Sequence, residues 1–356
     1  MKIGILGAGQ LGRMLALAGY PLGMHFRFFD PAPNSPADPL AENVTADYMN
    51  TYALDRFANG LDVVTYEFEN VPVEAVRYLE RSVPVYPPPI ALEKGQDRFV
   101  EKSFLHELGI PVPQFGIETK SISFPSVVKT RRMGYDGKGQ AVLSSKDDIR
   151  DQAVSELLTH DDLIVEEFIP FDRELSIIGV RNKSGESVFY PLIENRHRDG
   201  ILRESLVTGQ IPSDLQRQAE EYAKKVMDAL NYVGVLAIEF FEKDGRLVAN
   251  EMAPRVHNSG HWTIDGAVTS QFENHLRAVS DAPLGSTNPL GVCAMVNLIG
   301  NVPDAKSILE IEGAHLHLYG KEPKPKRKLG HVTFVENDVQ ALQKKLDRIE
   351  EIHHDS

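Results

Sequence analysis

The sequence predicts an α/β layer at the N-terminus, followed by a strand-rich α+β portion. Between residues 2 and 66, strand-like apolar runs alternate with helical stretches, a pattern that favours a parallel sheet. From residue 126 onward, short apolar runs follow one another with turn residues between them. The 356 residues are enough for two or three domains that share a cleft.

We divide the chain into three parts: residues 1–95, residues 96–288 with a flap at residues 120–190, and a small β-rich part at residues 289–356. The first boundary falls at VPVYPPPI, Val83–Ile90, because proline-rich sequence cannot continue a helix and favours extended backbone. We interpret this run as a linker or an interdomain strand.

The N-terminal part is predicted to contain strands at Lys2–Leu6, Phe26–Phe29 and Leu61–Tyr66, and a helix at Gln10–Ala18. Another helix is expected from Gln96 to Leu108. The central strands are expected at Ser126–Lys129, Gln140–Leu143, Leu163–Phe168, Leu175–Val180 and Ser187–Leu192.

A charged helix at Asp214–Leu230 is predicted to precede a hairpin of Val235–Phe241 and Arg246–Met252, because Asp-Gly between two apolar runs is a strong turn signal. The last part offers strands in VCAMVNLI, AHLHLYG and GHVTFV, then a charged helix that Asn337 or Asp338 can cap.

Composition excludes several classes of protein. The chain is 42% apolar and 25% charged, the balance of a soluble globular protein, and its net charge of −13 argues against a nucleic-acid partner. It has no signal-peptide pattern and no apolar run long enough to cross a membrane. A single cysteine, Cys293, cannot form an intrachain disulfide, so we expect a cytoplasmic protein.

Two glycine-rich loops are candidate phosphate sites. GAGQLG, Gly7–Gly12, follows a strand and opens a helix, and Asp30 ends the next strand, which is the pattern of a dinucleotide-binding dehydrogenase. KTRRMGYDGKGQ, Lys129–Gln140, lies between two strands and is therefore a hairpin flap. Its glycines allow close approach of a ligand, and its lysines and arginines, Arg131 and Arg132 among them, supply cations for a polyphosphate.

The hairpin at residues 235–252 brings two carboxylates together. A three-residue loop would place Glu239 opposite Glu251, and a two-residue loop would place it opposite Asn250. Like charges facing each other on a sheet are destabilising unless a cation lies between them. The pattern therefore indicates a hard cation such as Mg²⁺ that bridges nucleotide phosphates.

These motifs, with IVEEFIPFDRELS (Ile164–Ser176), resemble the ATP-grasp fold, which clamps ATP between two α+β subdomains. Within that superfamily, five motifs resemble the N5-carboxyaminoimidazole ribonucleotide synthetase family: GQLGRM, GYDGKGQ, RDGILR, APRVHNSGHWT and RKLGH. The resemblance runs from Met1 to about Thr333. It implies a Rossmann-like pre-ATP-grasp domain, an ATP-grasp domain with a glycine-rich flap and a small β-rich C-terminal domain.

By this resemblance, the chain uses ATP, Mg²⁺ and bicarbonate to carboxylate the amine of 5-aminoimidazole ribonucleotide through carboxyphosphate, without NAD or biotin. Homodimers are typical of the family. Glu239 and Glu251 would hold the metal ion. The implied ATP contacts are Arg98, Lys129, Gly134, Tyr135, Asp136, Gly137, Lys138, Gly139, Gln140, Glu166, Glu167, Phe168, Ile169, Glu174, His197, Asn250 and Glu251.

The same resemblance implies contacts to the ribonucleotide and to the acyl group. Arg255 would bind bicarbonate or carboxyphosphate, Asp136 is a candidate proton acceptor, and Lys328 is a candidate catalytic cation. The implied substrate contacts are Gln10, Leu11, Glu67, Tyr135, Arg255, His257, Asn258, Ser259, Arg327 and Lys328.

Several alternatives stay open from the sequence. A formate-dependent glycinamide ribonucleotide transformylase shares the nucleotide clamp, although HNSGHW after Pro254-Arg255 favours the carboxylating enzyme. An NAD-dependent dehydrogenase would use GAGQLG and Asp30 but would leave the second glycine loop and the glutamate pair without a role. A non-catalytic nucleotide-binding protein would not need both glutamates.

Overall fold

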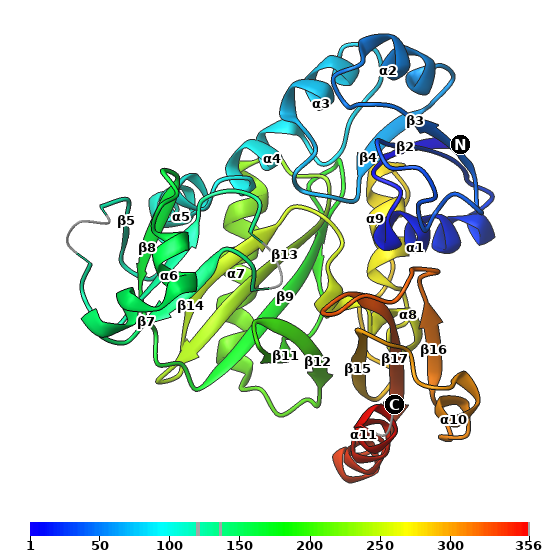
Figure 1. Ribbon diagram of the computed structural model, residues 1–356. Helices are drawn as coiled ribbons and strands as arrows, with labels where there is room; N and C mark the ends of the chain where they lie inside the picture. The colour runs from blue at the N-terminus through cyan, green and yellow to red at the C-terminus, as the bar shows by residue number, and fades with distance from the viewer. Residues whose placement is uncertain (119–121, 135–136, 355–356) are drawn as a thin grey trace.

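The structure is a computed structural model that describes residues 1–118, 122–134 and 137–354. Figure 1 shows three sheets: a small N-terminal sheet, a separate lid sheet, and a long central sheet that continues into the C-terminal part. No helix among the described residues is both long and apolar enough to span a bilayer.

The N-terminal sheet is parallel, with strand order β3-β2-β1-β4, as the alternation of strands and helices predicted. The predicted strands and first helix are confirmed, whereas β3, a short strand with polar residues, was not predicted. The elements of this part are β1 (Lys2–Leu6), α1 (Gln10–Gly19), η1 (Tyr20–Leu22), β2 (His25–Asp30), β3 (Glu42–Thr45), α2 (Thr51–Ala58), β4 (Val63–Tyr66), α3 (Val73–Glu80) and α4 (Pro89–Gly95).

The proline-rich run at residues 83–90 is extended at its start and helical at its end. Val85 forms a single parallel bridge to Val64 of β4, and Pro89 opens α4, where a proline has no hydrogen bond to lose. The run therefore connects the N-terminal sheet to α5 (Arg98–Glu107), the helix that was predicted from Gln96. Asp97 caps α5 by accepting hydrogen bonds from the backbone N–H groups of Phe99 and Val100.

The lid is an antiparallel sheet with strand order β5-β8-β6-β7. The predicted strands are confirmed as β6 and β7, and as β8 to within one residue. Its elements are β5 (Phe115–Gly116), β6 (Ser126–Thr130), β7 (Gln140–Leu143), η2 (Lys146–Arg150), α6 (Gln152–Leu157) and β8 (Leu163–Glu167). Val128, Leu143 and Leu163 form part of its own small core.

The central sheet has nine strands within the described residues, in the order β14-β13-β9-β11-β12-β15-β17-β16, with β10 paired to β9. Its strands are β9 (Arg173–Arg181), β10 (Ser187–Phe189), β11 (Ile193–Arg198), β12 (Ile201–Val207), β13 (Gly234–Lys243), β14 (Arg246–Ala253), β15 (Val292–Ile299), β16 (His315–Leu318) and β17 (Lys328–Glu336). The predicted C-terminal strands β15, β16 and β17 thus extend this sheet through the pairing of β15 with β12.

Helices cover both faces of the central sheet. They are α7 (Ser213–Ala229), η3 (Asn258–Gly260), α8 (Thr263–Gly266), α9 (Gln271–Val279), α10 (Ala305–Leu309) and α11 (Val339–His354). Helix α7 buries Leu215, Ala219 and Val226 against β13 and its neighbours, and Asp338 caps α11, as predicted, through the N–H of Ala341.

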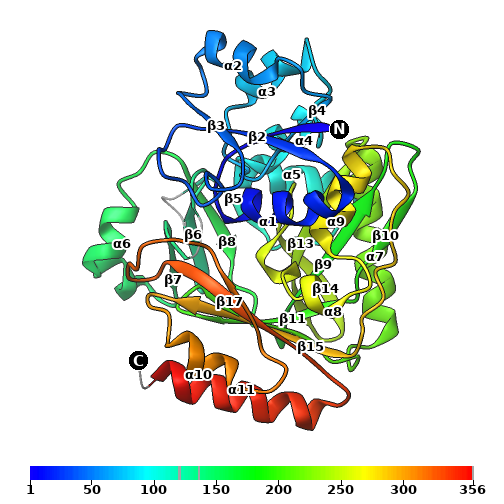
Figure 2. The same cartoon turned by 90° about the vertical axis from the view of Figure 1, so that its right-hand side faces the viewer.

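Helix α9 joins the N-terminal and central parts. Figures 1 and 2 show α9 beside α1, and the two share one core in which Leu276 of α9 packs among residues of both sheets. One apolar core is continuous across the two parts. The N-terminal and central residues that line the site between them are therefore held in fixed relative positions.

Candidate active site

One cavity of about 790 Å³ lies where the three parts of the molecule meet. It contains most of the residues that the sequence singled out. They are Gln10, Leu11, Glu67, Arg98, Lys129, Gly134, Gly137, Lys138, Gln140, Glu166, Glu167, Phe168, Ile169, Glu174, His197, Glu239, Asn250, Glu251, Arg255, His257, Asn258, Arg327 and Lys328.

Two of the described site residues, Ser259 and Gly139, are not among the residues that line the cavity. Ser259 is fully buried behind His257, and Gly139 lies at the base of the flap, where its carbonyl accepts a hydrogen bond from the N–H of Thr130. Tyr135 and Asp136 lie outside the described residues.

The hairpin β13–β14 sets the register of the two glutamates in an unexpected way. The turn has two residues, Asp244 and Gly245, which by itself would place Glu239 opposite Asn250. A β-bulge shifts the pairing between Glu239 and Phe240, so that Asn250 is the extra residue and Glu239 faces Glu251. The predicted pairing of Glu239 with Glu251 is therefore confirmed, but it arises from a two-residue turn and a bulge and not from a three-residue loop.

The electrostatics around Glu239 fit a divalent cation. Burial and the charge of Glu251 raise the pKa of Glu239 to about 7, against the opposing charges of His197 and Lys328. Glu251 is more exposed and lies 3.7 Å from Arg98. Two facing carboxylates are the ligands that Mg²⁺ prefers. No group of three metal-ligating side chains exists among the described residues, so the phosphates of a nucleotide and water would complete the coordination.

Buried cations surround the bulge. Lys102 is fully buried and donates hydrogen bonds to the carbonyls of Ala249 and Asn250 on β14, the edge strand of the central sheet. Lys129 donates to the Asn250 side chain at 3.3 Å and to Glu166 at 2.8 Å. Burial alone would raise the pKa of Glu166, but Lys102 and Lys129 hold it below its usual range.

Two aromatic rings shape one end of the cavity. Phe171 and Phe241 stack with their ring centroids 4.8 Å apart and their planes 8° apart, and both line the cavity near Phe168 and Ile169 of the segment after β8. An apolar wall beside exposed backbone groups suits a flat heterocycle such as adenine. No local pattern indicated this pair, because 70 positions separate the two residues in the sequence.

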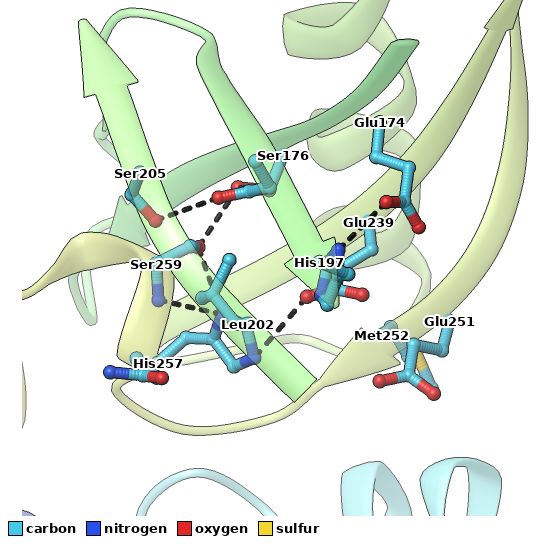
Figure 3. Close-up of polar contacts among 12 residues, drawn as sticks. Glu174, Ser176, His197, Leu202, Ser205, Glu239, Glu251, Met252, His257 and Ser259 are labelled. Atoms are coloured by element: carbon cyan, nitrogen blue, oxygen red, sulfur yellow. Dashed lines mark hydrogen bonds and ion pairs between the residues drawn. The ribbon is translucent and has the colours of Figure 1, made fainter. Parts of the chain in front are cut away.

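Glu174 of β9 and His197 of β11 form an ion pair that Figure 3 shows beside Glu239. Nδ1 of His197 lies 2.8 Å from a carboxylate oxygen of Glu174. Burial would lower the pKa of His197, but the bond to Glu174 and the charge of Glu239 raise it above its ordinary value. His197 therefore places a partly positive ring next to the glutamate pair.

Arg255 is held by Glu69, a residue that the sequence did not single out. Nε of Arg255 donates to the carboxylate of Glu69, and Nη1 donates to the carbonyl of Val256 at 3.0 Å. Burial opposes the charge of Arg255, but Glu69 raises its pKa, so the guanidinium stays positive at the cavity wall. The fork is therefore oriented before any anion binds.

The segment His257–Ser259 is built around buried bonds. Nε2 of His257 lies 3.6 Å from Glu239, and burial holds the pKa of this histidine well below its ordinary value, so its ring is neutral. Asn258 exchanges two side-chain amide bonds with Asn297 of β15, at 3.1 and 2.8 Å. The C-terminal part of the chain thus fixes the orientation of Asn258, which the sequence could not show.

The first glycine loop is occupied by the chain's own carboxylates. Glu67 accepts hydrogen bonds from the N–H groups of Gly9 at 2.6 Å and Gly12 at 2.7 Å, and Asp30 accepts one from Ala8 at 2.8 Å. These are the groups that would bind the phosphates of a dinucleotide. Two carboxylates already satisfy these donors and repel an anion at this place, which argues against the dehydrogenase interpretation.

Basic residues of the 321–328 segment close the cavity on the side of the first loop. Lys321, which the sequence did not single out, donates a hydrogen bond to the side chain of Gln10. Burial raises the pKa of Glu239 and lowers that of His257, and the positive charge of Lys328 acts to lower both, so Lys328 lies near the glutamate pair. Arg327 donates to the carbonyl of Glu322 at 3.2 Å.

The base of the flap is anchored to helix α5. Arg131 and Arg132 were predicted to supply charge to a polyphosphate, but both pair with Asp97, at 2.7 and 3.3 Å. Arg98 instead reaches the flap, donating to the carbonyl of Gly134 at 3.1 Å. The cation beside Glu251 is therefore Arg98.

The flap lies against the turn between β11 and β12. The Cα of Gly200 is 3.1 Å from the place where a Cβ on Gly137 would lie, and both glycines have positive φ values, 75° and 71°. A side chain at Gly137 would separate the two backbones. This contact explains the RDGILR motif, whose glycine the sequence alone did not account for.

Sequence reasoning missed three charged residues beneath the site: the half-buried Glu69 and the buried Glu101 and Lys102. Glu101 accepts a hydrogen bond from the N–H of Met252 at 2.5 Å, beside Glu251, and burial raises its pKa to about 8. One signal existed: Glu101 and Lys102 fall on the buried face of a short helix, where charged residues are rare unless they are paired.

Comparisons with known proteins place the whole chain in one group. Three family models match it: the ribonucleotide synthetase preATP-grasp domain over residues 1–96, the ATP-grasp domain over residues 103–272, and the phosphoribosylaminoimidazole carboxylase C-terminal domain over residues 293–345. The N5-carboxyaminoimidazole ribonucleotide synthase of Pseudomonas aeruginosa is 50% identical, over 98% of this chain and 99% of that protein.

Solved structures agree with the family models. The N5-carboxyaminoimidazole ribonucleotide synthetase of Thermus thermophilus has a TM-score of 0.92 and 52% identity, covering 98% of each chain. The synthase of Aspergillus clavatus, solved with ADP and 5-aminoimidazole ribonucleotide, has a TM-score of 0.89 and 31% identity, covering 99% of each chain.

Proposed function

This chain belongs to the N5-carboxyaminoimidazole ribonucleotide synthase family, and we propose that it uses Mg²⁺ and takes its carboxyl group from bicarbonate. Enzymes of this family are ATP-dependent ligases that carboxylate 5-aminoimidazole ribonucleotide in purine biosynthesis. The observation that carries the proposal is the facing pair Glu239 and Glu251 in a cavity that all three parts of the chain line. Their position, between the cations Lys129 and Arg98 and the acceptor segment at residues 255–258, suits phosphoryl transfer to a small anion.

ATP would bind between the lid and the central sheet. Its adenine would lie beside Phe171 and Phe241, and its ribose hydroxyls would reach Glu174. Lys129 and Arg98 would neutralise the phosphates. Glu239 and Glu251 would hold Mg²⁺, which neutralises phosphate charge when it is bound. Phosphoryl transfer needs mainly positioning and charge neutralisation, which these residues supply.

Bicarbonate would bind at Arg255, because a guanidinium fork matches two carboxylate oxygens. Bicarbonate is a poor electrophile, and its phosphorylation to carboxyphosphate makes the carbonyl carbon open to attack by a weakly nucleophilic amine. Lys328 and His257 face the same part of the cavity and would stabilise the negative charge that develops there. Closure of the flap against the turn at Gly200 would exclude water from the intermediate.

The ribonucleotide would bind on the opposite side, against the first glycine loop. Gln10, Leu11 and Glu67 line this side of the cavity, and Lys321 and Arg327 lie in the basic segment above it. Because both oxygens of Glu67 hold the loop, we propose that Glu67 shapes this site and does not act as its main hydrogen-bond acceptor. Asp136 remains our candidate for the group that takes the proton of the amine.

We also propose that the protein is a homodimer in the cytoplasm, since homodimers are typical of the family and the single cysteine, Cys293, is buried and unpaired. Sedimentation at micromolar concentration tests the dimer. A single species at the mass of one 39.6 kDa chain would reject it.

Phosphate release from ATP tests the function. With Mg²⁺ and bicarbonate, release should rise on addition of 5-aminoimidazole ribonucleotide, with a matching loss of its free amine. Glycinamide ribonucleotide with formate serves as the control for the related transformylase reaction. Activity only with formate and glycinamide ribonucleotide would show that the carbon donor is formate and not bicarbonate. No phosphate release in either assay would reject the proposal.

A further inference from the structure

Four buried polar side chains form a chain of hydrogen bonds behind His257. Ser176 lies on β9, Asn195 on β11, Ser205 on β12 and Ser259 in η3, and none is more than 4% exposed. Placing polar groups in a core is costly unless each finds a partner. The hydrogen bonds among these four side chains are therefore needed for the fold to be stable.

The bonds are short and continuous. Oγ of Ser205 lies 2.8 Å from Oδ1 of Asn195, and Nδ2 of Asn195 lies 2.8 Å from Oγ of Ser176. Oγ of Ser176 is 2.8 Å from Oγ of Ser259, which is 2.9 Å from Nδ1 of His257. Figure 3 shows this line running from Ser205 through Ser176 and Ser259 to His257.

The amide of Asn195 sets the direction of the bonds on either side of it, and Ser176 donates onward to Ser259. The amide oxygen only accepts, so Ser205 donates to it, and the amide nitrogen only donates, so Ser176 accepts from it. The hydrogen of Ser176 is then left for Ser259, and the hydrogen of Ser259 is left for Nδ1 of His257. Nδ1 is consequently an acceptor.

A second bond gives the same answer independently. The backbone N–H of Ser259 also points at Nδ1 of His257, at 3.3 Å, and a backbone N–H can only donate. The amide of Gln271 in addition holds the backbone of His257 on both sides, accepting from its N–H at 3.0 Å and donating to its carbonyl at 2.6 Å. The ring therefore keeps one orientation.

The other ring nitrogen faces the reaction site. Nε2 of His257 lies 3.6 Å from Glu239 and His257 lines the cavity beside Arg255. A neutral imidazole carries one hydrogen, and when Nδ1 accepts, that hydrogen is on Nε2. His257 thus offers an N–H to the cavity and has no lone pair there with which to take a proton.

We propose that Ser176 is a positioning residue that, through Ser259, fixes the hydrogen of His257 on Nε2, so that His257 donates a hydrogen bond to an oxygen of bicarbonate or of carboxyphosphate. The inference rests on the proposed function for the identity of the anion. It also excludes His257 as the base for the amine of the ribonucleotide. Ser176 of β9 pairs with Glu239 of β13. The register of these two strands therefore positions both Glu239 and the hydrogen-bonded side chains behind His257.

The tautomer can be measured directly on the full chain by the ¹⁵N shifts and ring couplings of labelled histidine, with His257 assigned by its loss in a His257→Gln variant. The wild type is expected to show His257 with its hydrogen on Nε2. A wild type with the hydrogen on Nδ1 overturns the proposal, and this result needs no variant to fold.

Ser176→Ala removes the donor to Ser259 and leaves the longer backbone bond of Ser259, at 3.3 Å, to hold Nδ1 of His257, so the tautomer with its hydrogen on Nδ1 should gain population. The expected kinetic result is a roughly ten-fold fall in kcat for phosphate release in the presence of 5-aminoimidazole ribonucleotide, with an unchanged KM for ATP. Ser126→Ala is the matched control, because Ser126 is buried on β6 and its hydroxyl has no hydrogen-bond partner among the described residues. It should keep the wild-type tautomer and kcat.

A Ser176→Ala protein with the wild-type tautomer and kcat would overturn the positioning role. Failure of the proposed function is distinguishable, because it would appear as a wild-type protein whose phosphate release does not respond to the ribonucleotide. The tautomer of His257 in the resting protein is measured without any turnover.

Discussion

The two glycine-rich loops look alike in sequence and differ in what faces them. The loop at Gly7–Gly12 donates its N–H groups to Glu67 and Asp30, so its anion site is filled from within the chain. The flap between β6 and β7 lies over a cavity, beside Lys129 and Arg98, and against the glycine turn at Gly200. A glycine pattern therefore predicts that some group approaches the backbone closely. Whether that group is a ligand or a side chain of the protein itself depends on the rest of the fold.

The largest expected effect lies beneath the flap. Glu251→Gln keeps the volume of the side chain but removes a charge opposite Glu239. Several kcal/mol of charge stabilisation depend on the metal ion, so ATP turnover should fall by at least about 100-fold. Steady-state phosphate release measures this, with Glu221→Gln on the exposed face of α7 as the control. Wild-type turnover in Glu251→Gln would remove Glu251 from the metal site.

The next effect tests the first loop. Glu67→Gln can accept from only one of the N–H groups of Gly9 and Gly12, so one buried donor loses its partner. We expect the free energy of unfolding to fall by about 2 kcal/mol, measured by denaturant titration. Glu42→Gln, which breaks an exposed ion pair with Arg27, should cost less than about 0.5 kcal/mol. Equal costs for the two variants would show that Glu67 does not support the loop.

A comparison of two glycine variants distinguishes the effect of backbone strain from the effect of flap closure, and its expected size is smaller. Gly137→Ala and Gly209→Ala place a side chain at similar positive φ values, 75° and 71°, but only Gly137 faces another backbone. Both should lose about 1 kcal/mol of stability, whereas kcat/KM for ATP should fall on the order of ten-fold in Gly137→Ala alone. Identical kinetics in the two variants would reject the contact between flap and turn.

The smallest expected effect is a pH dependence. Burial raises the pKa of Glu101 to about 8 in the folded chain, from an ordinary value of 4.5. The stability that a raised carboxyl pKa contributes is present below pH 4.5 and is lost as the pH rises through 8. Glu101→Gln cannot titrate, so its stability should fall less than that of the wild type between pH 5 and 8, by a difference on the order of 1 kcal/mol. Parallel curves of unfolding free energy against pH would contradict this account of Glu101.

Local patterns predicted most of the architecture. The apolar runs that became β1, β6 and β7, and the Asp-Gly turn of the β13–β14 hairpin, depend on nearby residues and were predicted correctly. Strand β11, with the sequence IENRHR, was missed because its polar residues read as a loop. They are polar because Asn195 joins the buried chain of hydrogen bonds and His197 lines the cavity.

The sequence predicted which types of residue form the site. It predicted less well how those residues are arranged. The sequence brought Glu239 and Glu251 together, but it did not show the bulge at Asn250, whose carbonyl accepts a hydrogen bond from Lys102, 148 positions earlier in the chain. Glu67 was expected by resemblance to contact the substrate, yet it binds the N–H groups of residues 58 and 55 positions earlier in the chain. Contacts of this kind are set by how the sheets pack and leave no periodic signal in the sequence.

Hydrogen–deuterium exchange with and without Mg²⁺ and ADP tests the difference between the two loops most directly. We predict that the amides of Ala8, Gly9 and Gly12 exchange slowly in both states, because Glu67 and Asp30 already bind them, while peptides covering β6, the flap and β7 gain protection only with the nucleotide. Nucleotide-dependent protection at residues 7–12, with none over the flap, would contradict this difference between the loops.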